Sequence, residues 1–212
     1  MTDAGTMGHD MGGDAAVDQS RRRFLTVATS ATAAVGVAFA VTPFVASWNP
    51  SERARALGAP LLIDLSKLEP GQLITPVWRK QPIYVFRRPP QIVAQLAAHD
   101  GRLKDPKSAE SDQPAYADNE QRSRRADVAV LIGTCTHLGC LPKQHFEPGD
   151  ALLGTDWPGG FLCPCHGSRF DMAGRVFNGS PASTNLRIPP YSFPTDNTLL
   201  IGQDETTAQG AA

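Results

Sequence analysis

Two short motifs constrain the fold of this chain more than any other feature. They read CTHLGC at 135–140 and CPCHGS at 163–168, and they contain all four cysteines and two of the five histidines of the 212 residues. Thiolate and imidazole groups are common protein ligands of zinc and iron. Since 22 residues separate the motifs, a fold that uses both must bring two distant loops to one place.

The six ligand-type side chains have three possible uses. One zinc ion takes four ligands, so it would leave two unused, and neither motif has the usual paired-cysteine spacing. Two disulfides would use every cysteine outside the cytoplasm, but they would leave the repeated histidine placement unexplained. The third use divides the set between two iron ions and one disulfide, and employs each residue once. The residues alone leave these alternatives open.

An uncharged run from Phe24 to Ser51 follows the arginines at 21–23. As a helix, the 25 residues from Phe24 to Trp48 would span about 37 Å, which exceeds the hydrocarbon thickness of about 30 Å. The run is apolar on all faces, which argues against a core helix of a soluble protein. It predicts one membrane-spanning helix, and the arginines predict a cytoplasmic N-terminus with the rest of the protein outside.

The same stretch is similar to a bacterial twin-arginine export signal, which the sequence SRRRFL at 20–25 resembles. The run is rich in Ala and Thr and only mildly hydrophobic, which suits that route. A cleaved signal is the competing interpretation, with Ala38-Phe39-Ala40 as the cleavage site. We expect a retained anchor. Asn49–Pro60, polar and bounded by prolines, is expected to be a flexible hinge.

The remainder favours short strands. The chain has 18 prolines and 19 glycines, which predict many turns. Strand patterns precede and follow the motifs, and residues 101–126 are a polar, loop-rich insertion. The expected strands are LLIDLSKL at 61–68, a hairpin of QLITPVWRK and PIYVFRR, ADVAVLIGT at 126–134, GRVF at 174–177, LRIPPYSF at 186–193 and NTLLIG at 197–202, with a short helix in PPQIVAQLAAHD. The predicted head is an antiparallel β structure with both motifs on loops at strand ends.

Charge excludes one function class. The formal net charge is −1, so there is no basic footprint for nucleic acid. The one basic cluster, Arg122, Arg124 and Arg125, is expected to be a solvated surface. His9, His99 and His145 lie in polar sequence and are expected to be surface residues without a role.

With both motifs in view, the chain resembles the Rieske iron-sulfur proteins, and among them the iron-sulfur subunit of bacterial quinol:cytochrome c oxidoreductase, the cytochrome bc complex. The resemblance implies a Rieske-type antiparallel β sandwich with an inserted cluster-binding subdomain, on a single N-terminal transmembrane helix. The implied segments are 1–20 cytoplasmic, 21–48 signal and anchor, 49–60 hinge, 61–205 head with its cluster-binding part at about 128–182, and 206–212 tail.

The resemblance also implies the site. One 2Fe-2S cluster takes Cys135 and Cys163 on one iron and His137 and His166 on the other. Cys140 and Cys165 form a disulfide that joins the two loops, and the ferredoxin and ring-hydroxylating members of the group typically lack this pair. Ser168 donates a hydrogen bond to a bridging sulfide, which raises the reduction potential. Gly139 and Gly167 allow tight turns, and Pro164 and Leu138 shape and shield the pocket.

Two departures from the family pattern stand out. Phe170 replaces a tyrosine whose hydroxyl reaches a ligand sulfur, so one hydrogen bond is missing and a lower potential is expected. The loop that covers the cluster has the pattern Gly-Pro-Ala-Pro in the family, and here 179–183 reads GSPAS.

The implied function is transfer of one electron and one proton from quinol, with His166 or His137 as the quinol contact, and delivery of the electron to a membrane-bound c-type cytochrome. The implied partners are a cytochrome b subunit, that cytochrome, quinol and the lipid bilayer, in a dimeric complex. The implied location is the bacterial inner membrane, with the head periplasmic. The alternative is a small Rieske electron-transfer subunit of another periplasmic oxidoreductase, such as an arsenite-oxidase-like enzyme.

Overall fold

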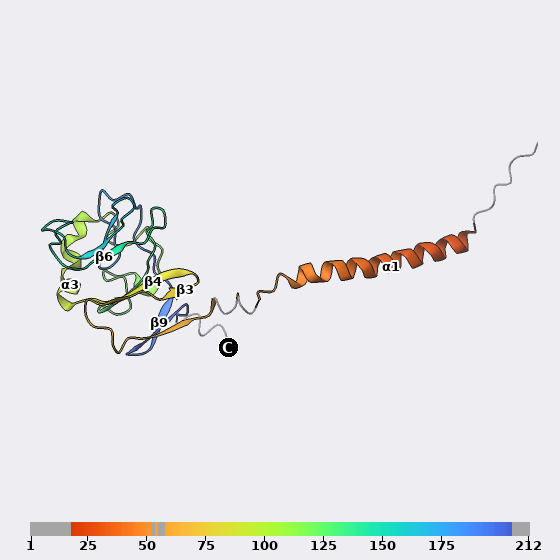
Figure 1. Ribbon diagram of the computed structural model, residues 1–212, viewed down its shortest axis with the longest axis horizontal. Helices are drawn as coiled ribbons and strands as arrows, with labels where there is room; N and C mark the ends of the chain where they lie inside the picture. The colour runs from red at the N-terminus through yellow and green to blue at the C-terminus, as the bar shows by residue number, and fades with distance from the viewer. Residues whose placement is uncertain (1–17, 52–53, 55–57, 205–212) are drawn as a thin grey trace, which may run out of the picture. The chain divides into compact units, whose positions relative to one another are not determined.

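The structure is a computed structural model that describes residues 18–51, 54 and 58–204. The chain divides into two compact units, Met1–Ser51 and Glu52–Ala212. Figure 1 shows the first unit as one helix and the second as a head of short strands and loops. His9 and the tail 206–212 lie outside the described residues.

Helix α1 runs from Gln19 to Ala46, and its N-terminus is capped by Asp18, whose carboxylate accepts from the amides of Ser20 and Arg21. None of its residues is buried. By length and composition the helix is able to cross a membrane, although a signal sequence near the N-terminus passes the same test. The predicted membrane-type helix is therefore present.

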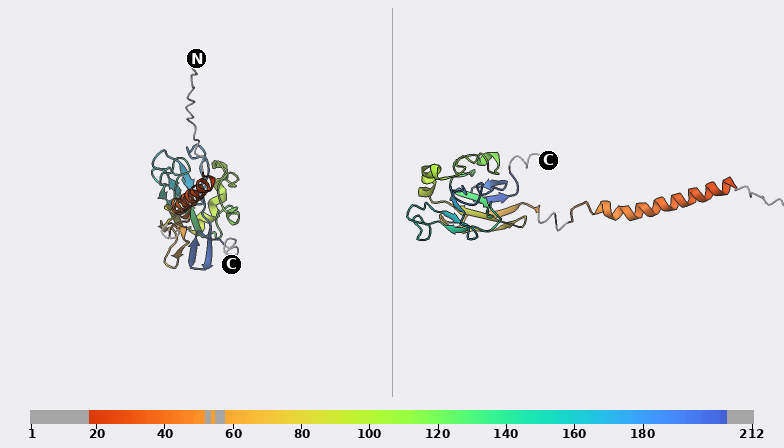
Figure 2. Two further views of the ribbon diagram at one scale, coloured as in Figure 1. Left: turned by 90° about the vertical axis from the view of Figure 1, so that its right-hand side faces the viewer. Right: turned by 90° about the horizontal axis from the view of Figure 1, so that it is seen from above.

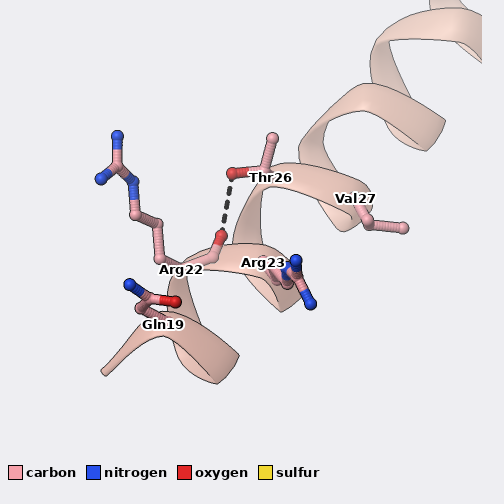
Figure 3. Close-up of a pocket in the computed structure, with 5 residues that line it drawn as sticks. All are labelled: Gln19, Arg22, Arg23, Thr26 and Val27. Atoms are coloured by element: carbon pink, nitrogen blue, oxygen red, sulfur yellow. Dashed lines mark hydrogen bonds between the residues drawn. The ribbon is translucent and has the colours of Figure 1, made fainter. Parts of the chain in front are cut away.

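Three threonines of α1 donate their hydroxyl hydrogens to backbone carbonyls of the same helix. Figure 3 shows the Thr26 hydroxyl donating to the carbonyl of Arg22 at 2.8 Å. Thr32 and Thr42 do the same one turn back along the helix, at 2.8 and 2.7 Å. A hydroxyl that bonds the preceding turn does not need water, so a threonine-containing run remains compatible with a hydrocarbon environment.

Within its described residues, the head contains three small sheets whose strand ladders are all antiparallel, as predicted. Figure 2 shows their short strands gathered in the head from two further directions. The first has the order β1-β10-β9, with β1 at Leu61–Asp64, β10 at Thr198–Ile201 and β9 at Tyr191–Thr195. The second has the order β2-β4-β3 with β5 beside β4; its bounds are Leu73–Ile74, Gln81–Arg87, Val77–Trp78 and Val128–Ile132. The third has the order β6-β7-β8, at Lys143–His145, Gly160–Leu162 and Arg169–Asp171.

Strands β4 and β5 form the centre of the head. All five residues of β5, VAVLI, are buried, and β4 buries four in succession. Tyr84 lies opposite Leu131, and Val85 opposite Val130. Continuous β-branched and aromatic runs fit strands covered on both faces. The core also includes Phe161 of β7, so it extends into the third sheet.

The hairpin predicted from QLITPVWRK and PIYVFRR has two short strands on its first side in place of one continuous strand. The segment 72–80 forms two short strands, β2 and β3, and each pairs with β4. Between β3 and β4, Arg79 and Lys80 have φ of 48° and 62°. Positive φ at both central residues belongs to the tight turn that matches the twist of a two-residue hairpin.

Between β4 and β5 the chain forms helix α3 at Pro90–Gln95 and two 3₁₀ helices, η1 at Leu96–Arg102 and η2 at Ala115–Ala117. The short helix predicted here is present. The strand predicted at 174–177 is wrong, because the segment makes only isolated bridges, Phe170 with Val176 and Leu103 with Phe177. Its position is fixed instead by contacts with the insertion, which the sequence did not reveal.

Candidate functional site

The two motifs fold into equivalent turns. The amide of Gly139 donates to the carbonyl of Cys135 at 2.9 Å, and the amide of Gly167 donates to the carbonyl of Cys163 at 2.9 Å. Both glycines have positive φ, 80° and 75°, which side chains rarely tolerate. The turns follow β5 and β7, so each strand delivers one cysteine to the start of a loop.

The four cysteines divide into two kinds. Cys135 and Cys163 are free thiols and are buried, with 3% and 2% exposure. Cys140 and Cys165 form a disulfide that joins the two loops, the pairing that the family resemblance implies. The sulfurs of Cys140, Cys163 and Cys165 lie within 4.8 Å of one another, so the disulfide lies directly beside one of the free thiols.

The free thiols also interact with each other. Burial raises the pKa of the Cys135 thiol, and contact with Cys163 adds to this rise, while the amide of His137 and the hydroxyl of Ser168 act in the opposite direction. A metal holds a cysteine as its thiolate. The site therefore contains two adjacent buried sulfurs whose deprotonation a bound metal would favour.

His137 and His166 lie on the outside of the same place. Both side chains are exposed, and their rings meet edge to face with centroids 4.8 Å apart. Each comes from a different motif, so the histidines meet only because the turns face each other. The donor set of the site is therefore two buried sulfurs and two exposed imidazoles. Such a set suits two metal ions with different ligands, one bound by sulfur and the other by nitrogen.

Ser168 is fully buried beside this donor set. Its hydroxyl acts to lower the pKa of the Cys135 thiol, and its oxygen accepts from the amide of Ala182 at 3.0 Å. Phe170 follows in β8, also fully buried, in the same apolar cluster as Cys135 and Cys163. The ring has no hydroxyl to offer the sulfurs.

The loop 179–184 contacts both motifs. Besides the bond from Ala182 to Ser168, the carbonyl of Thr184 accepts from the hydroxyl of Thr136 at 2.6 Å. The Ser180 hydroxyl accepts from the amide of Arg169 at 3.0 Å. Thr136 lies inside the first motif, between two expected ligands, and the sequence provided no signal for its role.

The exposed rim of the site is apolar. Leu138 is 70% exposed and Leu141 is 54% exposed, and Pro164 is also exposed. Leu138 and Pro164, which we expect to shape and shield the pocket, are both exposed; Leu138 directly follows His137, and Pro164 lies two residues before His166.

A buried ionic network forms around Asp171, the last residue of strand β8. Asp171 is fully buried and accepts from His99 Nε2 at 3.2 Å and from Arg175 Nε at 2.8 Å. Burial opposes its charge, but the hydrogen bond from His99 and the charge of Arg175 lower the pKa of the carboxyl overall. The prediction that His99 is a surface residue without a role is wrong, because η1 packs it against β8. Arg175 reaches Asp100 as well, at 2.8 Å.

The basic cluster was also wrongly predicted as solvated. Arg122 is 1% exposed, and its guanidinium donates to the carbonyls of Ala173 at 3.0 Å and Leu186 at 2.8 Å. Burial lowers the pKa of Arg122 to about 10. Arg124 stacks over the ring of Tyr116 at 3.6 Å. These carbonyls come from residues distant in sequence, so local composition could not reveal them.

His145 and Arg125 also make structural contacts that their polar sequence did not predict. His145 is half-buried and pairs with Asp150 at 2.9 Å, so it too has a structural contact. Arg125 is partly buried and binds the carboxylate of Asp127 through two nitrogens, at 3.1 and 2.8 Å. Neither contact reaches the donor set.

The donor set fits a 2Fe-2S cluster of the Rieske type. Two buried thiols and two imidazoles 4.8 Å apart would supply the ligands for such a group, and the buried Ser168 hydroxyl beside them would supply one hydrogen bond. A tetrahedral zinc site would take the same four residues. It would leave no reason for the histidines to remain exposed at an apolar rim, where a redox partner is able to reach them.

Comparison with known proteins places this site in a family. Residues 65–191 match the Rieske [2Fe-2S] domain, and residues 11–51 match the N-terminal segment described as the TAT signal of the ubiquinol-cytochrome c reductase Fe-S subunit. The iron-sulfur subunit of ubiquinol-cytochrome c reductase from Allochromatium vinosum is 52% identical over 91% of this chain and 93% of its own length. The same subunit from Rhodospirillum rubrum is 42% identical over 87% and 93%. Among solved structures, a chain of a hyperthermophilic respiratory complex III is 28% identical, covering 82% of this chain and 98% of its own, with a TM-score of 0.47.

Proposed function

Because this chain belongs to the Rieske [2Fe-2S] family, among the iron-sulfur subunits of ubiquinol-cytochrome c reductase, we propose that its two motif loops hold one 2Fe-2S cluster and present a histidine to quinol. As such a subunit, the chain takes part in electron transfer from ubiquinol to cytochrome c. The named relatives support this function over an electron-transfer subunit of the arsenite-oxidase-like kind.

The observation that carries the assignment is the division of the site into a buried and an exposed side. Cys135 and Cys163 are buried and would hold one iron, whereas His137 and His166 are exposed and would hold the other. The disulfide between Cys140 and Cys165 keeps the two loops together when the metal is absent.

When bound, the cluster supplies a one-electron acceptor whose potential lies above that of all-cysteine clusters, in a range of about −150 to +300 mV. The protein supplies the proton site. An imidazole that uses one ring nitrogen as a ligand keeps the far nitrogen for a titratable proton. Because both rings are exposed, either far nitrogen is able to accept the hydrogen bond and then the proton of a quinol hydroxyl.

We assign the quinol contact to His166, with His137 as the second candidate. The exposed Leu138 and Leu141 surround this position with apolar surface, which suits a hydrophobic quinol and the membrane-embedded cytochrome b that would contain it. The same exposed tip would then meet a membrane-bound c-type cytochrome. In this proposal the head visits both partners within a dimeric complex.

The proposed hinge and anchor would allow the head to move between these two partners. A head on a short flexible tether is confined near the membrane at high effective concentration, so it meets two docking sites in turn. We propose that 1–20 is cytoplasmic, that 21–48 is a retained twin-arginine signal and anchor in the bacterial inner membrane, and that 49–60 is the hinge. The head, 61–205, is then periplasmic, where a disulfide persists.

Electron paramagnetic resonance of membranes that carry this chain tests the function directly. After mild reduction we expect a Rieske-type signal, and we expect an inhibitor of the quinol-oxidation site to shift it, because the inhibitor would bind next to an exposed histidine ligand. A signal that the inhibitor does not shift would favour the alternative oxidoreductase. The absence of any Rieske-type signal in membranes shown to contain the protein would contradict the cluster assignment.

Two histidine variants make the test specific. His166→Gln removes a proposed ligand and should abolish the signal. His145→Gln makes the same substitution in strand β6. The imidazole of His145 pairs with Asp150 and is not a proposed ligand, so the signal should persist. Protease treatment of spheroplasts tests the orientation, since only a periplasmic head is digested from outside.

A further inference from the structure

The insertion 101–126 reaches the site through one lysine. The ammonium of Lys104 donates to the carbonyl of Ser180 at 2.6 Å and to the carbonyl of Ala182 at 2.8 Å. Hydrogen bonds from a charged donor are stronger than those between neutral groups. One side chain therefore holds two carbonyls of the loop that contacts both motifs.

The base of that side chain is itself fixed. The amide of Lys104 donates to the carbonyl of Val176 at 3.0 Å, and Leu103 bridges to Phe177. Leu103 belongs to a small buried cluster with Trp157 and Phe177. Because the backbone is anchored at this point, the ammonium lies at a defined place relative to the loop.

The loop transmits this position to the site. Ala182, whose carbonyl accepts from Lys104, uses its own amide to donate to Ser168 Oγ at 3.0 Å. Both Ala182 and Ser168 are fully buried. Once Oγ accepts from the amide, the hydroxyl hydrogen is free to point away from it, toward the neighbouring Cys135 thiol, whose pKa this hydroxyl acts to lower.

We infer that Lys104 is a positioning residue for the redox centre, acting through Ala182 to direct the Ser168 hydroxyl at the cluster and so raise its reduction potential. The inference rests on the proposed function, since it requires the cluster to lie between Cys135 and Cys163. Hydrogen bonds to cluster sulfurs stabilise the reduced form, so a less well-directed hydroxyl favours the oxidised form.

The expected loss is partial. Ser180 keeps its own contact, because its hydroxyl accepts from the amide of Arg169 at 3.0 Å. Removal of the ammonium therefore loosens the loop without releasing it. For Lys104→Met we expect the preference for the reduced form to fall about fivefold, which lowers the potential by about 40 mV at 59 mV per tenfold change.

The test is a redox titration of membranes that carry the full-length chain, followed by the Rieske signal. Lys104→Met should lower the potential, and Lys104→Arg, which keeps a charged donor, should restore most of it. Lys107→Met is the matched control. Lys107 lies in the same insertion and pairs with Asp100 at 3.8 Å and Glu120 at 3.6 Å, so its loss removes the same charge without touching the loop.

A double-mutant cycle separates positioning from simple charge. If Lys104 acts through Ser168, then Lys104→Met should shift the potential in the parent and have no further effect in Ser168→Ala. Hydrogen exchange adds a readout independent of electron transfer, since the amide of Ala182 should exchange faster in Lys104→Met. Iron content and unfolding temperature verify that each variant is folded and loaded.

Two outcomes would overturn the inference: an unchanged potential in Lys104→Met, or an equal shift in the presence and absence of the Ser168 hydroxyl. The second result would mean that the charge acts directly on the cluster. Failure of the proposed function is distinguishable from failure of this inference, because the parent chain itself would then lack a Rieske signal.

Discussion

The hydroxyl of Tyr84 donates a 2.6 Å hydrogen bond to the carbonyl of Pro142. Tyr84 belongs to the central strand β4, and Pro142 lies two residues beyond Cys140. The ring stacks on Phe161, with centroids 5.2 Å apart. This contact attaches the end of the first motif to the core of the head, 58 residues away in sequence.

Tyr84→Phe should therefore destabilise the head by about 1–2 kcal/mol, because a buried carbonyl loses its donor. Burial, with the charge of Cys163 adding to it, raises the pKa of Tyr84 to about 12, so the hydroxyl stays protonated and the penalty should be constant from pH 6 to 9. Thermal unfolding at several pH values measures it. Tyr116→Phe, whose hydroxyl accepts from the amide of Tyr191, should cost stability without loosening the motif.

The disulfide stabilises the head by restricting the unfolded chain. Cys140 and Cys165 are 25 residues apart, for which loop-closure entropy predicts about 3.5 kcal/mol. The double variant Cys140→Ser/Cys165→Ser should lose its Rieske signal at a temperature about 10 °C or more below the parent. Parent protein treated with a strong thiol reductant should behave alike. Equal bleaching temperatures would show that the disulfide contributes nothing.

Phe170→Tyr should raise the reduction potential. Phe170 is fully buried in the same cluster as both free thiols, and a hydroxyl there that bonds a ligand sulfur would stabilise the reduced form. One such bond, at about 1 kcal/mol, corresponds to about 40 mV. Phe146→Tyr adds the same hydroxyl to a half-buried ring that packs on Phe161 and should leave the potential alone. No change in Phe170→Tyr would refute the idea that this departure lowers the potential.

Asp171→Asn should cost about 3 kcal/mol of unfolding free energy at pH 7, because it leaves the buried Arg175 without its main counter-charge. The charged or titratable groups that face Asp171 are His99 and Arg175, with Arg88 and Arg122 farther away. Together they lower the pKa of the carboxyl. Its stabilisation is therefore complete above the unfolded pKa of about 4, and it is lost as the pH falls through the lower folded value.

Denaturant unfolding at pH 7, 5 and 3.5 tests this dependence. The difference between parent and Asp171→Asn should be constant from pH 7 to 5 and narrow below pH 4. Asp100→Asn is the comparison, since Asp100 binds the same arginine at 2.8 Å but is 26% exposed, and its cost should be smaller. A difference that is already narrower at pH 5 would mean that another group dominates.

Much of this protein follows from local patterns. The uncharged run predicts α1 because length and apolarity alone decide whether a helix is able to cross a membrane. The buried-type run at 128–132 predicts β5 because β-branched residues in succession fit a covered strand. The two motifs indicate the donor set, since residue type and spacing determine which metals can bind.

The tertiary structure alone decided the contacts between distant segments. His99, Arg122 and Lys104 look like ordinary surface residues in polar sequence, yet each bonds a partner at least 50 residues away, namely Asp171, Ala173 and Ala182. No local pattern marks such a residue, because its burial depends on which carbonyl or carboxylate the folded chain brings to it. The sequence by itself thus indicated the donor set and the membrane-type helix, because both depend on residue type and spacing, whereas only the folded chain decided which side chains position the loops around the donor set.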